Sequence, residues 1–305
     1  MAKTKYIDTT KCTGCRGCMV SCKNWNELPA ESTGFTGTYQ SHPNLTANTW
    51  CLIKYKEQEV NGKMEWHFIK DTCKHCVDAA CVKACPQEAL YHNEWGAVVR
   101  DWDKCVGCGY CVTHCPFGVI QIQEFAEDGR VLVIDEENPR FVEEPGCQSA
   151  VRKSQYKGKV VTKSTKCNHC ESRVDAGRKP ACVSACPSGV LDFGEREEML
   201  AKAEARLAEV RDKYPNANIY NPESIEGTNA IYVLAEKPAY YDLPEKPVVP
   251  LSLALWKDVV QPLGKVAMLG SLSVAAVSLF LTTRAQKKHQ AEHGSGHDDE
   301  KGADV

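Results

Sequence analysis

The sequence predicts an α+β fold in which two pseudo-symmetric units are nested within one domain, followed by one C-terminal transmembrane helix. Sixteen of the 18 cysteines fall into four groups of four between residues 12 and 186. Short strand-like segments flank these groups, and an uncharged run of 18 residues lies at 266–283. Because grouped thiolates bind soft metal centres, the cysteines predict a metal-binding domain, while the uncharged run predicts a membrane segment.

The spacing of the cysteines indicates the kind of metal centre. The groups are Cys12, Cys15, Cys18 and Cys22; Cys73, Cys76, Cys81 and Cys85; Cys105, Cys108, Cys111 and Cys115; and Cys167, Cys170, Cys182 and Cys186. The first and third have the spacing C-x2-C-x2-C-x3-C, the bacterial ferredoxin signature for a 4Fe–4S cluster. Only Cys51 and Cys147 stand outside. The pattern predicts ferredoxin-like units that carry single electrons through four 4Fe–4S clusters.

The order of the groups predicts which cysteines share a cluster. In two-cluster ferredoxins the last cysteine of each group ligates the other cluster, and the simplest nesting pairs the first group with the fourth and the second with the third. The predicted sets are Cys12, Cys15, Cys18 and Cys186 for cluster A; Cys167, Cys170, Cys182 and Cys22 for cluster B; Cys73, Cys76, Cys81 and Cys115 for cluster C; and Cys105, Cys108, Cys111 and Cys85 for cluster D. The domain then spans 1–194, with units at 1–30 plus 160–194 and at 70–120.

Two other uses of the cysteines compete with this interpretation. Pairs of C-x2-C are common in structural zinc sites, so a zinc-stabilised scaffold without a redox role is an alternative. Zinc sites need neither a third cysteine at x2 nor a Cys-Pro after x3, and the spacing therefore favours iron. Disulfides are disfavoured because the chain is not a small secreted scaffold and begins Met-Ala-Lys-Thr-Lys, without an apolar signal segment.

Composition fits a globular electron carrier with a membrane appendage. The chain has 305 residues and a formal net charge of −3, which is long enough for roughly two domains. A near-neutral charge argues against a nucleic-acid partner. No catalytic constellation accompanies the cysteines, so the sequence predicts no catalytic site on this chain.

Several segments outside the cysteine groups have a strand-like pattern. Residues 50–55 and 64–69 predict a hairpin that turns at Asn61-Gly62. Residues 97–99 predict a strand before the third group.

A long insertion separates the third and fourth groups. It spans residues 120–163 and contains strand-like pieces at 131–134 and 159–162, with an acidic first half and a basic second half. One interpretation is a docking flap for a partner, and the alternative is a solvated surface hairpin.

Residues 195–214 predict an amphipathic helix that packs on the cluster domain. Its apolar face consists of Leu200, Ala203, Leu207 and Val210. Pro215 is expected to end the helix. A connector rich in proline then runs to residue 250 and contains the strand-like segment Ile231–Leu234.

Residues 251–284 contain the predicted transmembrane helix. The uncharged stretch reads VAMLGSLSVAAVSLFLTT, close to the ~20 apolar residues that a membrane span needs. A buried helix of a soluble domain is the alternative. Ala267, Ser271 and Ala275 repeat at four-residue spacing, which would let another membrane helix approach closely.

The flanks of this helix are polar. Arg284, Lys287 and Lys288 follow the uncharged stretch at once. No histidine lies between residues 256 and 284, so any haem would belong to a partner. The tail, 285–305, is polar and is expected to be disordered.

Some side chains adjacent to the cysteines are candidates for adjusting the clusters. His75 and His169 lie inside C-x2-C pairs and are expected to line the clusters, because cysteines already supply the ligands. The adjacent lysines are Lys11, Lys74, Lys104 and Lys166. Nearby cations should raise the potential of an anionic cluster, and the alternative is that these are ordinary surface lysines.

Several longer stretches resemble a known family. They are CTGCRGCMVSCKNWNE at 12–27, KDTCKHCVDAACVKACP at 70–86, CVGCGYCVTHCPF at 105–117, YNPESIEGTNAIYVL at 220–234 and ALWKDVVQPL at 254–263. Together with x4 in the second cysteine group and x11 in the fourth, they make the protein resemble the iron–sulfur β-subunits of molybdopterin oxidoreductases. It looks most similar to the β-subunit of membrane-bound respiratory formate dehydrogenase.

The resemblance implies a complex of three parts. A molybdopterin-containing catalytic α-subunit would oxidise formate at molybdenum or tungsten. This β-subunit would relay the electrons through four clusters, and a membrane cytochrome b, the γ-subunit, would pass them to quinone. The resemblance implies the same pairing of cysteine groups. The iron–sulfur subunit of a membrane-bound nickel–iron hydrogenase, or of another molybdopterin oxidoreductase, is the alternative.

The resemblance also implies a location. The cluster domain would lie in the periplasm and the single helix in the lipid bilayer of the inner membrane. The positive-inside rule, applied to Arg284, Lys287 and Lys288, favours a cytoplasmic C-terminal tail. The clusters must be built in the reducing cytoplasm, and this chain shows no export signal. Folded export alongside a partner with a twin-arginine signal is therefore expected.

Overall fold

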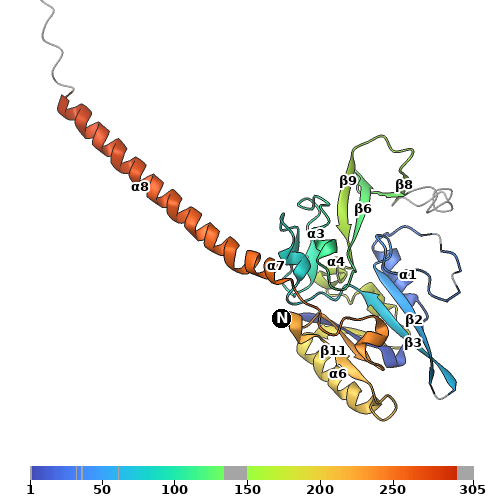
Figure 1. Ribbon diagram of the computed structural model, residues 1–305. Coiled ribbons are helices and arrows are strands. Elements are labelled where there is room, and N and C mark those ends of the chain that lie inside the picture. Colours follow the sequence, from blue (N-terminus) through green and yellow to red (C-terminus); the bar gives the residue numbers. More distant parts are fainter. Residues whose placement is uncertain (1, 32, 36, 61, 134–149, 294–305) are drawn as a thin grey trace, which may run out of the picture. The chain divides into compact units, whose positions relative to one another are not determined.

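The structure is a computed structural model that describes residues 2–31, 33–35, 37–60, 62–133 and 150–293 (Figure 1). The chain divides into two compact units, residues 1–250 and 251–305. The first unit is α+β, and most cysteines of the four groups belong to its main buried core or pack against it. The metal-binding region and the hydrophobic core are therefore the same part of the molecule.

A four-stranded sheet joins segments that are far apart in the sequence. Its strands, in spatial order, are β10 (Leu191–Glu195), β1 (Lys3–Asp8), β12 (Ala230–Leu234) and β11 (Asn218–Tyr220). β1 runs antiparallel to β10 and parallel to β12. The strand that leads into the first cysteine group thus lies beside the strand that follows the fourth group. The predicted strand at 231–234 is confirmed, and the connector joins this sheet.

Helix α6 (Arg196–Val210) packs on this sheet. The buried residues of the contact are Tyr6, Met199, Ala203, Ile231 and Val233. The predicted helix is confirmed, but its end is wrong, because the helix stops at Val210 rather than at Pro215. The backbone N–H groups of Lys213 and Tyr214 both donate to the Val210 carbonyl, and this turn ends the helix.

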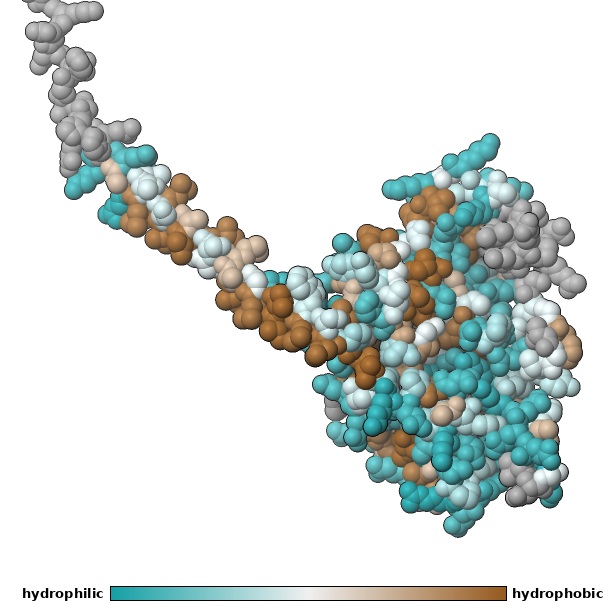
Figure 2. Space-filling model, viewed as in Figure 1, coloured by the Kyte–Doolittle hydropathy of each residue, from teal (hydrophilic) through white to brown (hydrophobic). Residues whose placement is uncertain are grey.

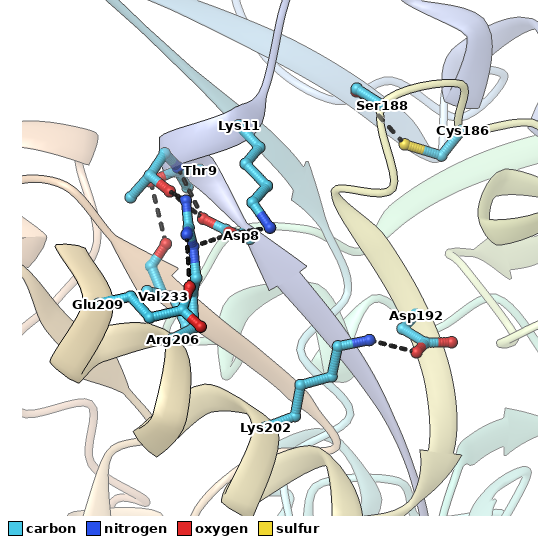
Figure 3. A network of polar contacts seen from close by, with 11 residues as sticks. Asp8, Thr9, Lys11, Cys186, Ser188, Asp192, Lys202, Arg206, Glu209 and Val233 are labelled. Atoms are coloured by element: carbon cyan, nitrogen blue, oxygen red, sulfur yellow. Dashed lines mark hydrogen bonds and ion pairs between the residues drawn. The ribbon is translucent and has the colours of Figure 1, made fainter.

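A polar network fixes the turn between β1 and the first cysteine (Figure 3). Arg206 Nε on α6 donates to Asp8 Oδ2 at 2.8 Å. Asp8 Oδ1 accepts the Thr10 N–H at 2.9 Å and thereby caps the 3-10 helix Thr9–Lys11. The loop that begins at Cys12 is therefore held from both sides.

The predicted hairpin is confirmed and is longer than expected. Strands β2 (Cys51–Val60) and β3 (Lys63–Thr72) pair antiparallel, with Val60 opposite Lys63. The two-residue turn places Gly62 at φ +74°, a conformation that glycine adopts without penalty. A second, short pair consists of β4 (Leu90–His92) and β5 (Val98–Arg100), and β5 is the strand predicted before the third group.

The insertion forms a sheet of its own. Its strands, in spatial order, are β8 (Ala150–Arg152), β7 (Val131–Val133), β6 (Gln121–Ala126) and β9 (Val160–Thr165). β7 and β9 confirm the two predicted strand-like pieces, whereas β6 and β8 were not predicted. Residues 134–149, which hold most of the acidic half and Cys147, lie outside the described residues.

Short helices follow the cysteine loops. They are α1 (Gly17–Trp25), α2 (Ala80–Lys83), α3 (Tyr110–Thr113), α4 (Glu171–Asp175) and α5 (Ala181–Ser184). Helix α1 carries the last two cysteines of the first group. α2, α3 and α5 each carry the third cysteine of a group, and the fourth cysteine follows the helix. Two further 3-10 helices span Glu223–Ile225 and Pro238–Tyr241.

The second unit is a long helix. It consists of α7 (Leu251–Leu255), a π-helical turn (Trp256–Val260) and α8 (Gln261–His293). Residues Leu251–Lys288 are long and apolar enough to cross a membrane, with a mean hydropathy of 1.9 in the most apolar window. Figure 2 shows the apolar side chains along this helix.

The predicted disorder of the tail is wrong for its first residues. α8 continues to His293, because Ala, Gln, Lys and Glu favour helix and no glycine or proline occurs in the tail before Gly294. Residues 294–305 lie outside the described residues.

Candidate cluster sites

Two small cavities are lined by the cysteines of two predicted sets. Cys12, Cys15, Cys18 and Cys186 line one of them. Cys85, Cys105, Cys108 and Cys111 line the other. In each cavity three cysteines come from one group, and the fourth comes from the partner group in the predicted nesting. The structure thus brings together the residues expected at clusters A and D.

The other two sets are also gathered. The Cys22 thiol lies close enough to those of Cys167 and Cys182 to interact with them electrostatically. The Cys170 thiol interacts with the same two thiols. The same relation links Cys76 to Cys73, Cys81 and Cys115. These are the residues expected at clusters B and C.

The four sets form a row. Cys18 of set A interacts electrostatically with Cys182 of set B. Cys73 of set C interacts with Cys167 of set B, and Cys81 of set C interacts with Cys111 of set D. The order in space is therefore A, B, C, D.

The geometry of the thiols suits a cluster better than a single ion. A zinc ion would hold its sulfurs at about 2.3 Å. Within the described ranges, no three His, Cys, Asp or Glu side chains come together closely enough to share one metal ion. A cubane instead binds its four thiolates at four separate iron corners, so its ligands need not converge on one ion.

Buried cations give independent support for an anionic group. Lys5 on β1 is fully buried, and its Nζ lies 4.0 Å from Cys167 Sγ. Burial alone would lower the pKa of Lys5, but the neighbouring thiolates, Cys167 first, reverse this and raise it. An ammonium group is stable in such a place only if it faces negative charge, which a cluster with four thiolates supplies.

Lys70 on β3 repeats this arrangement. It is buried, its Nζ lies 2.9 Å from Cys51 Sγ, and it interacts with thiols of sets A and B. Neither Lys5 nor Lys70 was predicted, because neither is adjacent to a cysteine in the sequence. The strands that carry them, KTKYID and KMEWHFIKDT, contain other charged residues, so the sequence offered no signal that singled out these two lysines.

The predicted lysines occupy different environments. Lys11 and Lys104 are exposed and lie 4.0 Å and 3.4 Å from Asp8 and Asp101, so for these two the surface alternative is correct. Lys74 is buried, and its charge is paired with Asp71 at 2.9 Å.

Lys166 is the predicted lysine whose charge has no carboxylate partner among the described residues. It is buried and donates to the carbonyls of Val98 and Cys167. It also interacts with Cys73 and Cys81 of set C.

Backbone and side-chain donors point at several cysteine sulfurs. The Sγ atoms of Cys85, Cys105 and Cys167 accept the N–H groups of Ala89 at 3.2 Å, Ser164 at 3.5 Å and His169 at 3.4 Å, and Cys22 Sγ accepts Asn26 Nδ2 at 3.6 Å. Such hydrogen bonds stabilise thiolate sulfur and raise cluster potentials.

The insertion is part of the wall around set D. Ser164 of β9 and Ile122 of β6 line the same cavity as its cysteines. Gly107, between two ligands, has φ +68°, and a Cβ atom there would lie 2.5 Å from the Thr162 carbonyl oxygen. The ligand loop therefore packs directly on β9, which a simple solvated hairpin would not explain.

Of the two cysteines outside the groups, the structure describes Cys51. Cys51 is buried beside Cys18 and Lys70, between sets A and B. Cys147 lies outside the described residues.

Burial makes two of the predicted ligands weaker acids. It raises the pKa of Cys111 and of Cys170 to about 11. These side chains hold their protons at neutral pH until iron displaces them.

Comparison with known proteins finds iron–sulfur domains in the same part of the chain. Models described as "4Fe-4S dicluster domain" match residues 64–128, 122–196 and 11–89. The protein is 36% identical to the formate dehydrogenase iron–sulfur subunit of Haemophilus influenzae, over 94% of this chain and 83% of that protein. It is 35% identical to the nitrate-inducible formate dehydrogenase iron–sulfur subunit of Escherichia coli, over 88% and 81%.

A further relative has a different enzyme name. The B subunit of anaerobic dimethyl sulfoxide reductase from E. coli is 33% identical, over 74% of this chain and 88% of that protein. Four gathered cysteine sets, the dicluster domains and these relatives together establish an electron-transfer subunit with four 4Fe–4S clusters and no catalytic site of its own. The protein belongs to the family of iron–sulfur subunits that includes these subunits of formate dehydrogenase and dimethyl sulfoxide reductase.

Proposed function

We propose that this protein relays electrons along the row A, B, C, D from a formate-oxidising catalytic subunit to a membrane cytochrome b and quinone. The crossed ligand sets predicted from the sequence would hold the four clusters. The single observation that carries the proposal is the row itself, since each set neighbours the next. When bound, each cluster supplies reversible one-electron chemistry.

The exposure of the ligands supports entry and exit at the two ends of the row. Cys15 in set A and Cys108 in set D are exposed, whereas all four cysteines of set B are buried. A partner can therefore approach the end sets closely. The protein's own part is to exclude water from the middle of the row and to set potentials with buried lysines.

The choice of formate rests on the relatives. The formate dehydrogenase subunits named above share the highest identity with this protein among the relatives described, and the catalytic partner would be a molybdopterin-containing α-subunit with molybdenum or tungsten. The apolar helix supports the further proposal that the protein is anchored in the lipid bilayer of the inner membrane beside a cytochrome b γ-subunit. Its cluster domain would be periplasmic and its C-terminal tail cytoplasmic.

Anaerobic purification of the complex tests this proposal. Iron analysis should find about sixteen irons in this subunit, four per cubane, and formate should reduce the clusters while hydrogen should not. Zinc in place of iron, or about eight irons, would contradict the four-cluster relay. Reduction by hydrogen instead of formate would replace the proposed partner with a hydrogenase.

A further inference from the structure

Two stacked histidines join the halves of the row. His75 lies inside the C-x2-C pair of the second group, and His169 lies inside that of the fourth group. Their ring centroids are 3.7 Å apart with planes inclined by 25°, and both side chains are fully buried. The contact therefore connects a ligand loop of cluster C with a ligand loop of cluster B.

A backbone hydrogen bond fixes the proton of His75. The Val98 N–H on β5 donates to His75 Nδ1 at 3.1 Å. A ring nitrogen that accepts a hydrogen bond carries no proton, so the neutral ring has its proton on Nε2. Nε2 is buried and has no hydrogen-bond partner within the described residues.

Among the described residues, the ring of His169 also lacks hydrogen-bond partners, and it lacks them at both nitrogens. Neither Nδ1 nor Nε2 has a partner within the described part of the chain, although both are buried. One of the two carries a proton in either neutral tautomer. A buried N–H without an acceptor is strongly unfavourable, so an acceptor belongs beside each ring.

The described side chains around the two rings do not supply these acceptors. Trp95 stacks parallel to His169 at 6.0 Å, and its Nε1–H is already donated to Asp175 at 3.0 Å. Phe193 presents a ring edge to His169 at 5.8 Å. Each histidine lies in the sequence between two predicted ligands, so the sulfur atoms of its own cluster are the acceptors that its ligand loop would bring to the ring.

We propose that His75 donates an N–H···S hydrogen bond to cluster C and that His169 donates one to cluster B. The inference rests on the proposed function for the presence of these clusters. Hydrogen bonds to cluster sulfur favour the reduced, more negative state. The two histidines therefore raise the reduction potentials of clusters B and C, which lie in different ferredoxin-like units. Both protons would stay on their ring nitrogens when an electron passes between the clusters held there.

Pulsed paramagnetic resonance on the intact complex tests the hydrogen bonds directly. With histidine labelled by ¹⁵N only in the ring, the reduced wild-type clusters B and C should each show a ¹⁵N coupling. His75→Phe should abolish the coupling at C alone, and His169→Phe the coupling at B alone. The ring-only label matters because the backbone N–H of His169 also points at a ligand sulfur.

Redox titration of the same variants gives a second readout. Phenylalanine keeps the stacked ring but cannot donate, so each variant should favour oxidation of its own cluster about tenfold, which is ~59 mV for one electron. His67→Phe is the control, since His67 is buried on β3 against Tyr240, with a ring distance of 5.5 Å. It should shift neither potential.

The possible results distinguish a failure of the histidine hydrogen bonds from a failure of the four-cluster relay. Four clusters without a ring ¹⁵N coupling, and with unchanged potentials in both variants, would overturn the histidine assignment alone. Fewer than four clusters in the wild type would overturn the relay and the assignment together. If a variant fails to fold, the wild-type ¹⁵N measurement still decides.

Discussion

Lys5 Nζ lies 4.0 Å from Cys167 Sγ inside the core, and no carboxylate pairs with this lysine among the described residues. The interaction connects the N-terminal strand with the fourth cysteine group. It places one full positive charge beside the predicted cluster B, where the low polarity of the core leaves that charge poorly screened.

Lys5→Met should lower the reduction potential of cluster B. The cation favours the more negative, reduced cluster, and methionine keeps most of the volume without the charge. The reduction equilibrium should shift on the order of tenfold, ~59 mV for one electron, as measured by redox titration monitored by paramagnetic resonance.

Lys11→Met is the matched control. Lys11 is adjacent to Cys12 in the sequence, but its side chain is 48% exposed and lies 4.0 Å from Asp8, so water and the carboxylate screen it. If Lys11→Met shifted the reduction potential of cluster A as much as Lys5→Met shifts that of cluster B, burial would not be what makes a lysine effective.

Cys22→Ala tests the crossed ligands. Cys22 is buried on α1 within reach of Cys167 and Cys182, so the variant should lose or convert cluster B. The cluster held by Cys12, Cys15 and Cys18 should stay comparatively intact. Iron content and the resonance signals of the reduced protein provide the measurement.

Cys51→Ala completes this comparison. Cys51 is also buried, beside Cys18, but belongs to no predicted set. It should keep all four clusters. Loss of a cluster in this variant, or loss of cluster A in Cys22→Ala, would show that the ligands have been assigned wrongly.

Gly107→Ala should destabilise cluster D. A side chain at φ +68° costs roughly 1–2 kcal/mol, and the new Cβ would lie 2.5 Å from the Thr162 carbonyl oxygen. Gly118→Ala shares the positive φ, +61°, but meets no atom within 4 Å. Loss of about four irons in the first variant only is expected, and equal iron in both would mean that contact with β9 is unimportant.

The cysteine pattern predicts much of the fold because metal ligation dictates local structure. The order of the groups predicts their nesting, and the residues predicted to share a cluster are gathered in space. Strand β6, with the sequence QIQEFA, was missed because it lacks a clear alternation of apolar and polar residues. Its pairing with β9 depends on tertiary packing against the third cysteine loop.

The charges around the clusters were the least predictable feature. Sequence adjacency selected Lys11 and Lys104, which lie at the surface, and could not select Lys5 and Lys70, which reach the thiols from strands. Side-chain direction on a sheet depends on register, and the register of β1 is set by β10 and β12. The stacking of His75 on His169 likewise requires that both ferredoxin-like units fold and pack together.

Removal of residues 251–305 should separate electron acceptance from quinone reduction. The first unit is compact by itself and keeps all sixteen ligands, so the truncated complex should assemble its clusters and keep formate oxidation with an artificial dye. It should lose firm membrane attachment and rapid reduction of a quinone analogue, because Leu251–Lys288 supplies the apolar span.

A second variant separates anchoring from helix packing. Leucine at Ala267, Ser271 and Ala275 keeps the helix apolar but removes its small-residue face, so the complex should stay in the membrane while quinone reduction slows. Dye activity should be unchanged and serves as the control for assembly. A truncated complex that remains in the membrane and reduces quinone at the full rate would show that the helix is not the anchor. Full quinone activity in the leucine variant would exclude this face from contact with the cytochrome.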